Sequence, residues 1–298
     1  MAKRGKSINL FLMDGEVTGR VKCTLANWTG VAYKIPRTDL DLCSNRGDLK
    51  QTGVYFLFGI SADDSEKSVV YIGQAGNRKN GEGILHRLQE QRRDMKKDYW
   101  NEAVVFTTSN NSFGPTEISF LENRFCNMAT ESSRYEVKNG NDPSPGNVTE
   151  EKQSELEDFI DNARLIMGTL GHKVFEPLVA SNTAVGLQNM ENFEQQLLYL
   201  NRKVRNVCTV NATAEQTSEG IVVLKESFIS PKEDENIPTA VKNMRKKARL
   251  DENGCTKDNY LFNSPSYTTV FVLGKSANGL TEWKNSEGIT LKVLENQV

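Results

Sequence analysis

The sequence predicts an α+β protein, in which strands and helices form separate groups instead of alternating along one parallel sheet. Three observations lead to this prediction. Short segments that alternate apolar and polar residues predict strands, whereas segments with apolar residues three and four apart predict helices. A stretch rich in Asn, Asp, Pro and Gly at 139–147 predicts a linker between an N-terminal and a C-terminal part.

Composition agrees with an ordinary globular chain. The 298 residues are 37% hydrophobic and 26% charged, and the formal net charge is −2, so about two domains are expected. Apolar runs such as 53–60 are far shorter than the roughly 18–20 residues that a bilayer helix needs, so no membrane partner is expected. The five cysteines are widely spaced without a CxxC pair, which favours free thiols and a cytoplasmic location.

The first half of the chain is predicted to contain two β-rich stretches followed by helices. Residues 7–35 begin as a hairpin, because Ile8, Leu10 and Leu12 alternate before a turn at Asp14 and Gly15. The remaining expected elements are strands at 53–60, 68–75 and 102–109, a helix at 83–95, and a helix that begins after Thr116 as N-cap.

The second half is predicted to begin with an amphipathic helix that Gly171 ends. A further helix is expected near 191–206, followed by strands over 209–227. A basic helix is expected at 236–250, another helix after Ser264 and Pro265, and a closing hairpin over 282–295.

Four polar residues in the central region suggest a reaction centre. Tyr55 and Tyr71 lie on successive predicted strands, Arg87 on the helix that follows, and Glu122 on the next helix. Each one alone is explained more simply as a core tyrosine or a solvated helix residue. If the four surround one cleft, they are the groups that phosphodiester hydrolysis needs.

In such a cleft an arginine holds the phosphoryl oxygens as negative charge develops on them. A single carboxylate is enough to hold Mg²⁺, or Mn²⁺ in its place, and the ion stabilises the leaving oxygen. A tyrosine accepts a proton from water only if the metal or a nearby cation lowers its pKa from about 10.

The ordered set GVY at 53–55, YIG at 71–73, Arg87 in ILHRLQ, Glu122 in SFLENRF and Asn139 in RYEVKNG resembles the signature of the GIY-YIG nucleases. The resemblance covers about 50–140. The end of the chain, from ATAEQTSEG to EWKNSEG, resembles an uncharacterised domain family that is often fused behind such modules.

The resemblance implies a role for each matched residue. Tyr55 is the implied general base, Tyr71 its partner, Arg87 the phosphate clamp, Glu122 the metal ligand and Asn139 a support for the site. It also implies a small, three-stranded, mostly antiparallel sheet flanked by helices. The chain would then divide into four parts. A β-rich segment at 1–50 packs on the nuclease module at 51–140, an acidic helical connector follows at 141–208, and a C-terminal α+β domain occupies 209–298.

Two positions depart from the family pattern. Many members have Lys directly after YIG and His four residues after the arginine, whereas this chain has Gln74 and Gln91; His86 is a possible substitute for the latter, although a surface position suits it better. The residues considered for contact with nucleic acid, with DNA the expected substrate, are Gln74, His86, Arg92, Arg93, Lys96 and Lys97.

Three functions are therefore open at this point. A metal-dependent endonuclease is the first, and a catalytically silent module that binds nucleic acid or acts as a scaffold is the second. In the third, the acidic middle and the C-terminal domain form a surface for a protein partner that recruits the nuclease. The basic run at 242–249 is a second candidate contact with nucleic acid or a partner protein.

Overall fold

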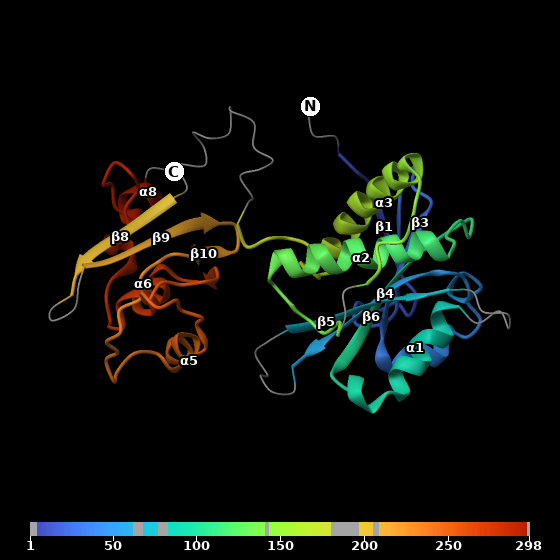
Figure 1. Cartoon of the computed structure of the whole chain (residues 1–298), viewed down its shortest axis with the longest axis horizontal. Helices are drawn as coiled ribbons and strands as arrows, with labels where there is room; N and C mark the ends of the chain where they lie inside the picture. Colours follow the sequence, from blue (N-terminus) through green and yellow to red (C-terminus); the bar gives the residue numbers. More distant parts are fainter. Residues whose placement is uncertain are drawn as a thin grey trace. The chain divides into compact units, whose positions relative to one another are not determined.

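The computed structural model of the chain describes residues 5–61, 68–76, 83–140, 143–179, 197–204 and 209–296. It divides into two compact units, Met1–Pro177 and Leu178–Val298. Each unit has its own sheet and its own helices, which confirms the α+β class (Figure 1). No helix among the described residues is both long and apolar enough to cross a membrane.

The first unit contains a seven-stranded mixed sheet with the order β1-β2-β3-β6-β4-β5-β7. All neighbours are antiparallel except β5 and β7, which are parallel. Its strands are β1 (Ile8–Leu12), β2 (Val21–Leu25), β3 (Gly30–Pro36), β4 (Gly53–Ile60), β5 (Ser68–Ala75), β6 (Trp100–Thr108) and β7 (Glu136–Val137).

The expectation of a three-stranded sheet is therefore wrong in extent. The predicted strands form its centre as β6-β4-β5, but β3 pairs with the outer edge of β6 from Gly30–Thr108 to Pro36–Glu102. Pairing continues outward because β3 carries backbone N–H and C=O groups along both edges, which bond β6 on one side and β2 on the other. The N-terminal hairpin is thus part of the same sheet, and Gly15 makes its turn with a φ of +73°.

Helices cover both faces of this sheet. They are α1 (Ile84–Arg93), α2 (Pro115–Ser132) and α3 (Glu150–Thr169), with short 3₁₀ segments η1 (Arg37–Cys43), η2 (Asp48–Lys50) and η3 (Met95–Lys97). In Figure 1, α2 and α3 lie on one face and α1 on the other. Strand β4 serves both cores: Phe56 faces α2 and α3, whereas Tyr55 and Leu57 face α1.

Helix α3 belongs to the first unit instead of forming a separate connector. Its apolar stripe, which includes Phe159, Ile160 and Met167, is buried in the same core as Phe56 and Phe106. Trp28 contacts Phe159 with ring centroids 4.8 Å apart. The predicted linker at 139–147 therefore lies between β7 and α3 within the first unit and does not mark the end of that unit.

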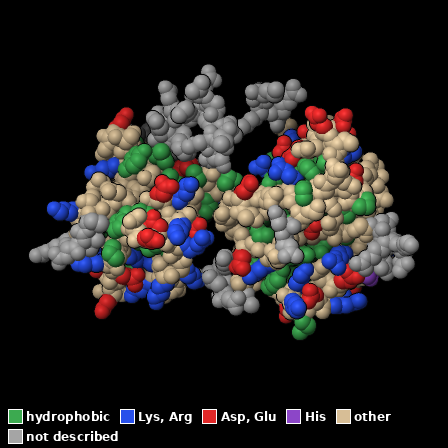
Figure 2. Space-filling model, in the orientation of Figure 1, with side chains coloured by type: hydrophobic (Ala, Val, Ile, Leu, Met, Phe, Trp, Pro, Cys, Tyr) green, Lys and Arg blue, Asp and Glu red, His purple; other side chains and the backbone are tan. Residues whose placement is uncertain are grey.

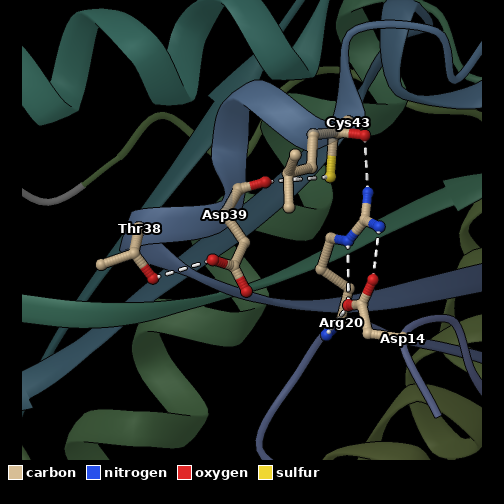
Figure 3. A network of polar contacts seen from close by, with 6 residues as sticks. Asp14, Arg20, Thr38, Asp39 and Cys43 are labelled. Atoms are coloured by element: carbon tan, nitrogen blue, oxygen red, sulfur yellow. Dashed lines mark hydrogen bonds and ion pairs between the residues drawn. The ribbon is translucent and has the colours of Figure 1, made fainter. Parts of the chain in front are cut away.

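A polar network ties the N-terminal hairpin to η1 (Figure 3). Arg20 Nε and Nη2 donate to the two carboxylate oxygens of Asp14, and Nη1 donates to the carbonyl oxygen of Leu42 at 2.5 Å. Arg20 holds the pKa of the Asp14 carboxyl at about 2 through these hydrogen bonds. The turn between β1 and β2 is thereby fixed against the segment that leads into β4.

The second unit contains a four-stranded antiparallel sheet with the order β11-β10-β9-β8. Its strands are β8 (Leu197–Lys203), β9 (Thr209–Thr217), β10 (Gly220–Val223) and β11 (Tyr260–Phe262). Its helices are α5 (Thr239–Lys247), α6 (Pro265–Leu273), α7 (Gly279–Glu282) and α8 (Leu291–Glu295).

Two predictions for this unit are wrong. A helix is expected near 191–206, but the described part of this segment is strand β8. Leu198 and Leu200 alternate with exposed Tyr199, and the strand pairs with β9. Residues 191–196 and 205–206 lie outside the described residues. The closing hairpin has only an isolated bridge between Lys284 and Thr290, after which α8 begins. The helices after Pro238 and Ser264 are confirmed.

Candidate active site

The two tyrosines of the predicted site lie on one face of the sheet. Strands β4 and β5 pair so that Tyr55 lies opposite Gly73 and Leu57 opposite Tyr71. The ring centroids of Tyr55 and Tyr71 are 6.2 Å apart. Tyr55 is fully buried, whereas Tyr71 is half-buried. Gly73 is needed here, because the Tyr55 ring occupies the space beside its Cα.

Arg87 reaches this pair from the second turn of α1. Its guanidinium forms an ion pair with Glu90, with Nη1 2.8 Å from Oε2, and lies close enough to Tyr55 for each group to shift the pKa of the other. The side chain keeps 36% of its surface exposed. A cation that lies near a buried phenol and remains partly open to solvent is suited to bind an incoming anion.

Gln91 is a site residue that motif comparison identified only as a departure. It lies one helical turn after Arg87, and its Nε2 donates a hydrogen bond of 3.0 Å to the Tyr55 hydroxyl oxygen. Gln91 is 4% exposed, and its Oε1 has no hydrogen-bond partner among the described residues. A neutral amide takes no proton at neutral pH, so Gln91 orients Tyr55 without acting as a base.

Burial raises the pKa of both phenols. For Tyr55 the neighbouring Tyr71 adds to the rise, and for Tyr71 the carboxylate of Glu122 does so. Arg87 opposes the rise in both, and a hydrogen bond from Tyr55 lowers the pKa of Tyr71. The resting site therefore holds neutral phenols at pH 7, and additional positive charge is required to form a phenolate.

Glu122 projects from α2 towards β5. Its Oε2 accepts a hydrogen bond of 2.8 Å from Gln74 Nε2, and the Ser119 hydroxyl donates to Gln74 Oε1 at 3.2 Å. Gln74 points to the face of β5 opposite to Tyr71. The hydrogen bond between Gln74 and Glu122 therefore lies on the other face of the sheet from the two tyrosine rings. The charge of Glu122 still raises the pKa of both Tyr55 and Tyr71.

Burial raises the pKa of Glu122 itself, while the Gln74 hydrogen bond and the charge of Arg87 lower it. The four predicted residues are thus brought within electrostatic reach of one another by β4, β5, α1 and α2. Among these four residues, the rings of Tyr55 and Tyr71 are in direct contact, while Arg87 and Glu122 act on both phenols through their charges.

The described residues offer few ligands for a divalent ion. Among the described residues no group of three or more His, Cys, Asp and Glu side chains could hold a metal. One half-buried carboxylate, Glu122, with the Gln74 amide beside it, fits Mg²⁺, which keeps several waters and takes most other ligands from substrate phosphates. It does not fit Zn²⁺, which takes three or four protein ligands.

Asn139 has a structural contact that explains its place in the motif. Its Nδ2 donates to the carbonyl of Ile72 at 2.7 Å, and its Oδ1 accepts from the Ile72 amide at 3.1 Å. Strand β7 pairs with β5 only at Val69 and Val70. The Asn139 amide therefore extends the ladder along β5, beside the residue that follows Tyr71.

The basic residues after Arg87 separate into different environments. Arg92 pairs with Asp41 through two hydrogen bonds of 2.9 and 3.1 Å. Its charge is therefore compensated by a carboxylate of the segment before β4. Arg93 and Lys96 are exposed, and His86 contacts Glu90, with Nδ1 3.5 Å from Oε1. Lys97 alone of the predicted cations lies against a tyrosine of the site.

The ammonium of Lys97 lies 3.4 Å from the centroid of the Tyr71 ring. Burial and repulsion by Arg87 lower the pKa of Lys97 to about 8, which Asp94 partly opposes. Two cations therefore flank Tyr71 at close enough range to repel each other. An anion between them would relieve that repulsion.

The basic run of the second unit is largely engaged inside that unit. Arg245 donates to the carbonyls of Ser230 and Phe271 and pairs with Glu233 at 3.0 Å, and its side chain is only 8% exposed. Lys242 Nζ donates to the Glu235 carbonyl at 2.5 Å. Lys246 and Lys247 are exposed. Figure 2 shows side chains of both charge signs on the visible face of this unit.

Comparison with known proteins adds one finding. A family described as a domain of unknown function, DUF4357, matches residues 203–295. This confirms that the end of the chain resembles an uncharacterised domain family, and the match begins at the last residue of β8. No curated protein and no solved structure matches the chain.

Proposed function

We propose that the first unit is a metal-dependent endonuclease of the GIY-YIG type that hydrolyses phosphodiester bonds, with DNA as its substrate. The observation that carries the proposal is the electrostatic coupling of Tyr55, Tyr71, Arg87 and Glu122, which come from four separate elements. Ionisable groups from separate elements that shift one another's pKa are typical of functional sites. No single packing contact among the described residues explains why two phenols, one guanidinium and one carboxylate gather around β5.

Arg87 and Lys97 bind the phosphate in this proposal. Both are partly exposed, and Tyr71 lies next to both of them. Bound between the two cations, a phosphoryl group stays oriented while negative charge grows on its oxygens.

A phenolate formed within the tyrosine pair would accept the proton of the attacking water. Tyr71 is the more accessible of the two, and its ring lies beside that of Tyr55, whose hydroxyl accepts a hydrogen bond from Gln91. A strongly coupled pair titrates as a unit, so the proton belongs to the pair instead of to one phenol. Glu122 would hold a Mg²⁺ or Mn²⁺ ion, with Gln74 orienting its carboxylate, and the ion would supply the positive charge that lowers the phenol pKa and stabilises the leaving oxygen.

Cleavage of supercoiled plasmid DNA with Mg²⁺ or Mn²⁺ tests the proposal. Glu122→Gln removes the charge with little change in shape and is expected to lower the rate by at least about 100-fold. Glu131→Gln is the matched control, because Glu131 is an exposed carboxylate on the same helix. The proposal fails if the wild type cuts neither DNA nor RNA with either metal, or if Glu122→Gln cuts as fast as the control.

A different result would favour the catalytically silent alternative. In that case the wild type binds nucleic acid without cutting it, and binding survives the combined loss of Tyr55, Arg87 and Glu122. Electrophoretic mobility shifts in EDTA measure this directly, because binding is then recorded apart from cleavage.

A further inference from the structure

Strand β1 is an unprotected edge of the seven-stranded sheet. It is first in the strand order and pairs on one side only, with β2, among the described residues. Natural edges are normally blocked by Lys, Pro or a bulge, because an open edge can add another strand. Residues 8–12 (INLFL) contain neither a charged residue nor Pro, and Leu10, Phe11 and Leu12 are 44, 56 and 36% exposed.

The opposite side of the sheet is managed differently. There β5 is followed by the short strand β7, and the Asn139 side chain extends the pairing along Ile72. Among the described residues, the sheet therefore has one side that its own chain closes and one side, along β1, without a further strand.

The backbone groups that point outward from β1 follow from its pairing with β2. Met13 donates to the carbonyl of Arg20, and Ala26 donates to that of Ser7, so the odd-numbered residues of β1 bond β2. Since successive residues alternate, the N–H and C=O groups of Ile8, Leu10 and Leu12 point to the open side.

These groups are self-complementary when the second strand is antiparallel. In a register centred on Leu10, Leu10 lies opposite its own copy and Ile8 lies opposite Leu12, so all three outward residues are paired. The side chains of these residues lie on the same face as buried Cys23 of β2, where Ile8 already packs against the core beneath α2 and α3. A second copy would continue that core with its own leucines.

The charges at the two ends of β1 favour the same direction. The antiparallel register places Lys6 of one copy across from Asp14 of the other, and a parallel pairing would place like charges together. Within its own chain Lys6 donates to Asn162 and Asp14 pairs with Arg20, so this preference acts chiefly against the parallel direction. We propose that β1 pairs with β1 of a second copy of this chain, antiparallel and centred on Leu10, to give a twofold-symmetric dimer with one continuous sheet.

Sedimentation equilibrium of the full chain across the micromolar range tests the proposal. The wild type is expected to approach twice its mass of 33.4 kDa as concentration rises. Leu10→Pro removes an outward N–H and leaves the hydrogen bonds of β1 to β2 intact, so it is expected to remain monomeric. Leu10→Lys is a second variant that places charge on the edge without restricting the backbone, and it is also expected to be monomeric.

Cross-linking fixes the register. In an antiparallel hydrogen-bonded pair the Cα atoms are about 5.5 Å apart, within the range a disulfide spans, so Leu10→Cys is expected to form a covalent dimer under mild oxidation. Phe11→Cys is the control, because Phe11 is even more exposed than Leu10 but lies opposite Asn9 in this register, and the two Phe11 positions are more than about 7 Å apart.

A wild type that stays monomeric, or a dimer that Leu10→Pro and Leu10→Lys leave intact, would overturn the proposal. Equal cross-linking of Leu10→Cys and Phe11→Cys would overturn the register. None of these measurements uses cleavage, so they stand apart from the proposed nuclease activity.

Discussion

The phenol of Tyr55 lies in the space that a side chain on Gly73 would occupy. A Cβ at Gly73 would be 2.5 Å from both Cζ and Oη of Tyr55, which is closer than real Cβ atoms approach their neighbours. The second glycine of the motif thus serves the first tyrosine directly, across the β4–β5 pair. It is a steric condition for the position of the buried phenol.

Gly73→Ala is therefore expected to displace Tyr55 by about 1 Å and to reduce cleavage by roughly 100-fold, because catalysis is sensitive to misplacement on that scale. The control is Gly76→Ala, just after β5, where an added Cβ meets only Ile118 Cδ1 at 4.0 Å. Steady-state cleavage rates are compared after circular dichroism has confirmed that both variants fold. Equal activity of the two would contradict the steric argument.

The hydrogen bond from Gln74 to Glu122 predicts opposite effects of two substitutions on the pH profile. Burial raises the pKa of Glu122 and Gln74 lowers it. In the proposed function, the charged carboxylate is the form that would hold the metal. In Gln74→Leu the pKa of Glu122 rises further, so activity is lost at a higher pH as the solution is acidified. In Gln74→Lys the added cation lowers the pKa of Glu122, and the acid limb moves to lower pH.

The measurement is kcat/KM against pH at saturating Mg²⁺. A shift of both variants in the same direction would show that a change in packing, and not the charge on Glu122, controls the acid limb.

Lys97 predicts a loss of affinity for nucleic acid in mildly alkaline solution. Because its pKa is about 8, Lys97 is charged at pH 7 and largely neutral at pH 9, while Arg87 stays charged throughout. The dissociation constant of a DNA oligonucleotide, measured in EDTA at constant ionic strength, is expected to rise severalfold between these pH values.

Variants assign this effect to one side chain. Lys97→Arg should bind equally well at both pH values, and Lys97→Gln should bind weakly at both. Lys96→Gln is the matched control, since the exposed Lys96 side chain lies outside the site, and it should keep the wild-type pH dependence. A wild-type constant that does not change with pH would contradict the role given to Lys97.

In the second unit, Arg245 predicts a large loss of stability. Its guanidinium bonds the carbonyls of Ser230 and Phe271 and the carboxylate of Glu233, so Arg245→Met leaves buried acceptors unpaired. The expected destabilisation is about 3 kcal/mol or more. Exposed Lys246 on the same helix provides the control, and Lys246→Met is expected to change stability by less than about 0.5 kcal/mol.

Urea unfolding of the full chain, followed by hydrogen exchange of α6 amides, measures this. Equal protection of α6 in Arg245→Met and Lys246→Met would contradict the assignment. That outcome would mean that the Arg245 side chain contributes little to the fold, and that its charge on α5 is available to a partner.

Local patterns predicted most of the elements but not their partners. Short apolar runs located β4 and β5, and capping residues located α6, because these signals are contained within a few neighbouring residues. Strand β8 was predicted as a helix because only its pairing with β9 makes the alternation of Leu198 and Leu200 meaningful. The extent of the first sheet depends likewise on the distant pairing of β3 with β6.

For the site, the motif residues were placed near one another, but their contacts were not foreseen. Gln91 follows Arg87 by one helical turn, and this spacing alone could have suggested that both face Tyr55. Lys97 could not have been chosen over Lys96 from the sequence, because the short segment η3 decides which of them turns towards Tyr71.

The burial of α3 has a practical consequence for anyone who wishes to isolate the proposed nuclease. A fragment that ends within 139–147, a stretch rich in turn-forming residues, would lack helix α3. Without Phe159, Ile160 and Met167, the side chains of Phe56 and Phe106 would be exposed to water. Such a fragment would aggregate, and its inactivity would be mistaken for a missing domain. A fragment that ends beyond Pro177 keeps the hydrophobic layer closed and is the one to express.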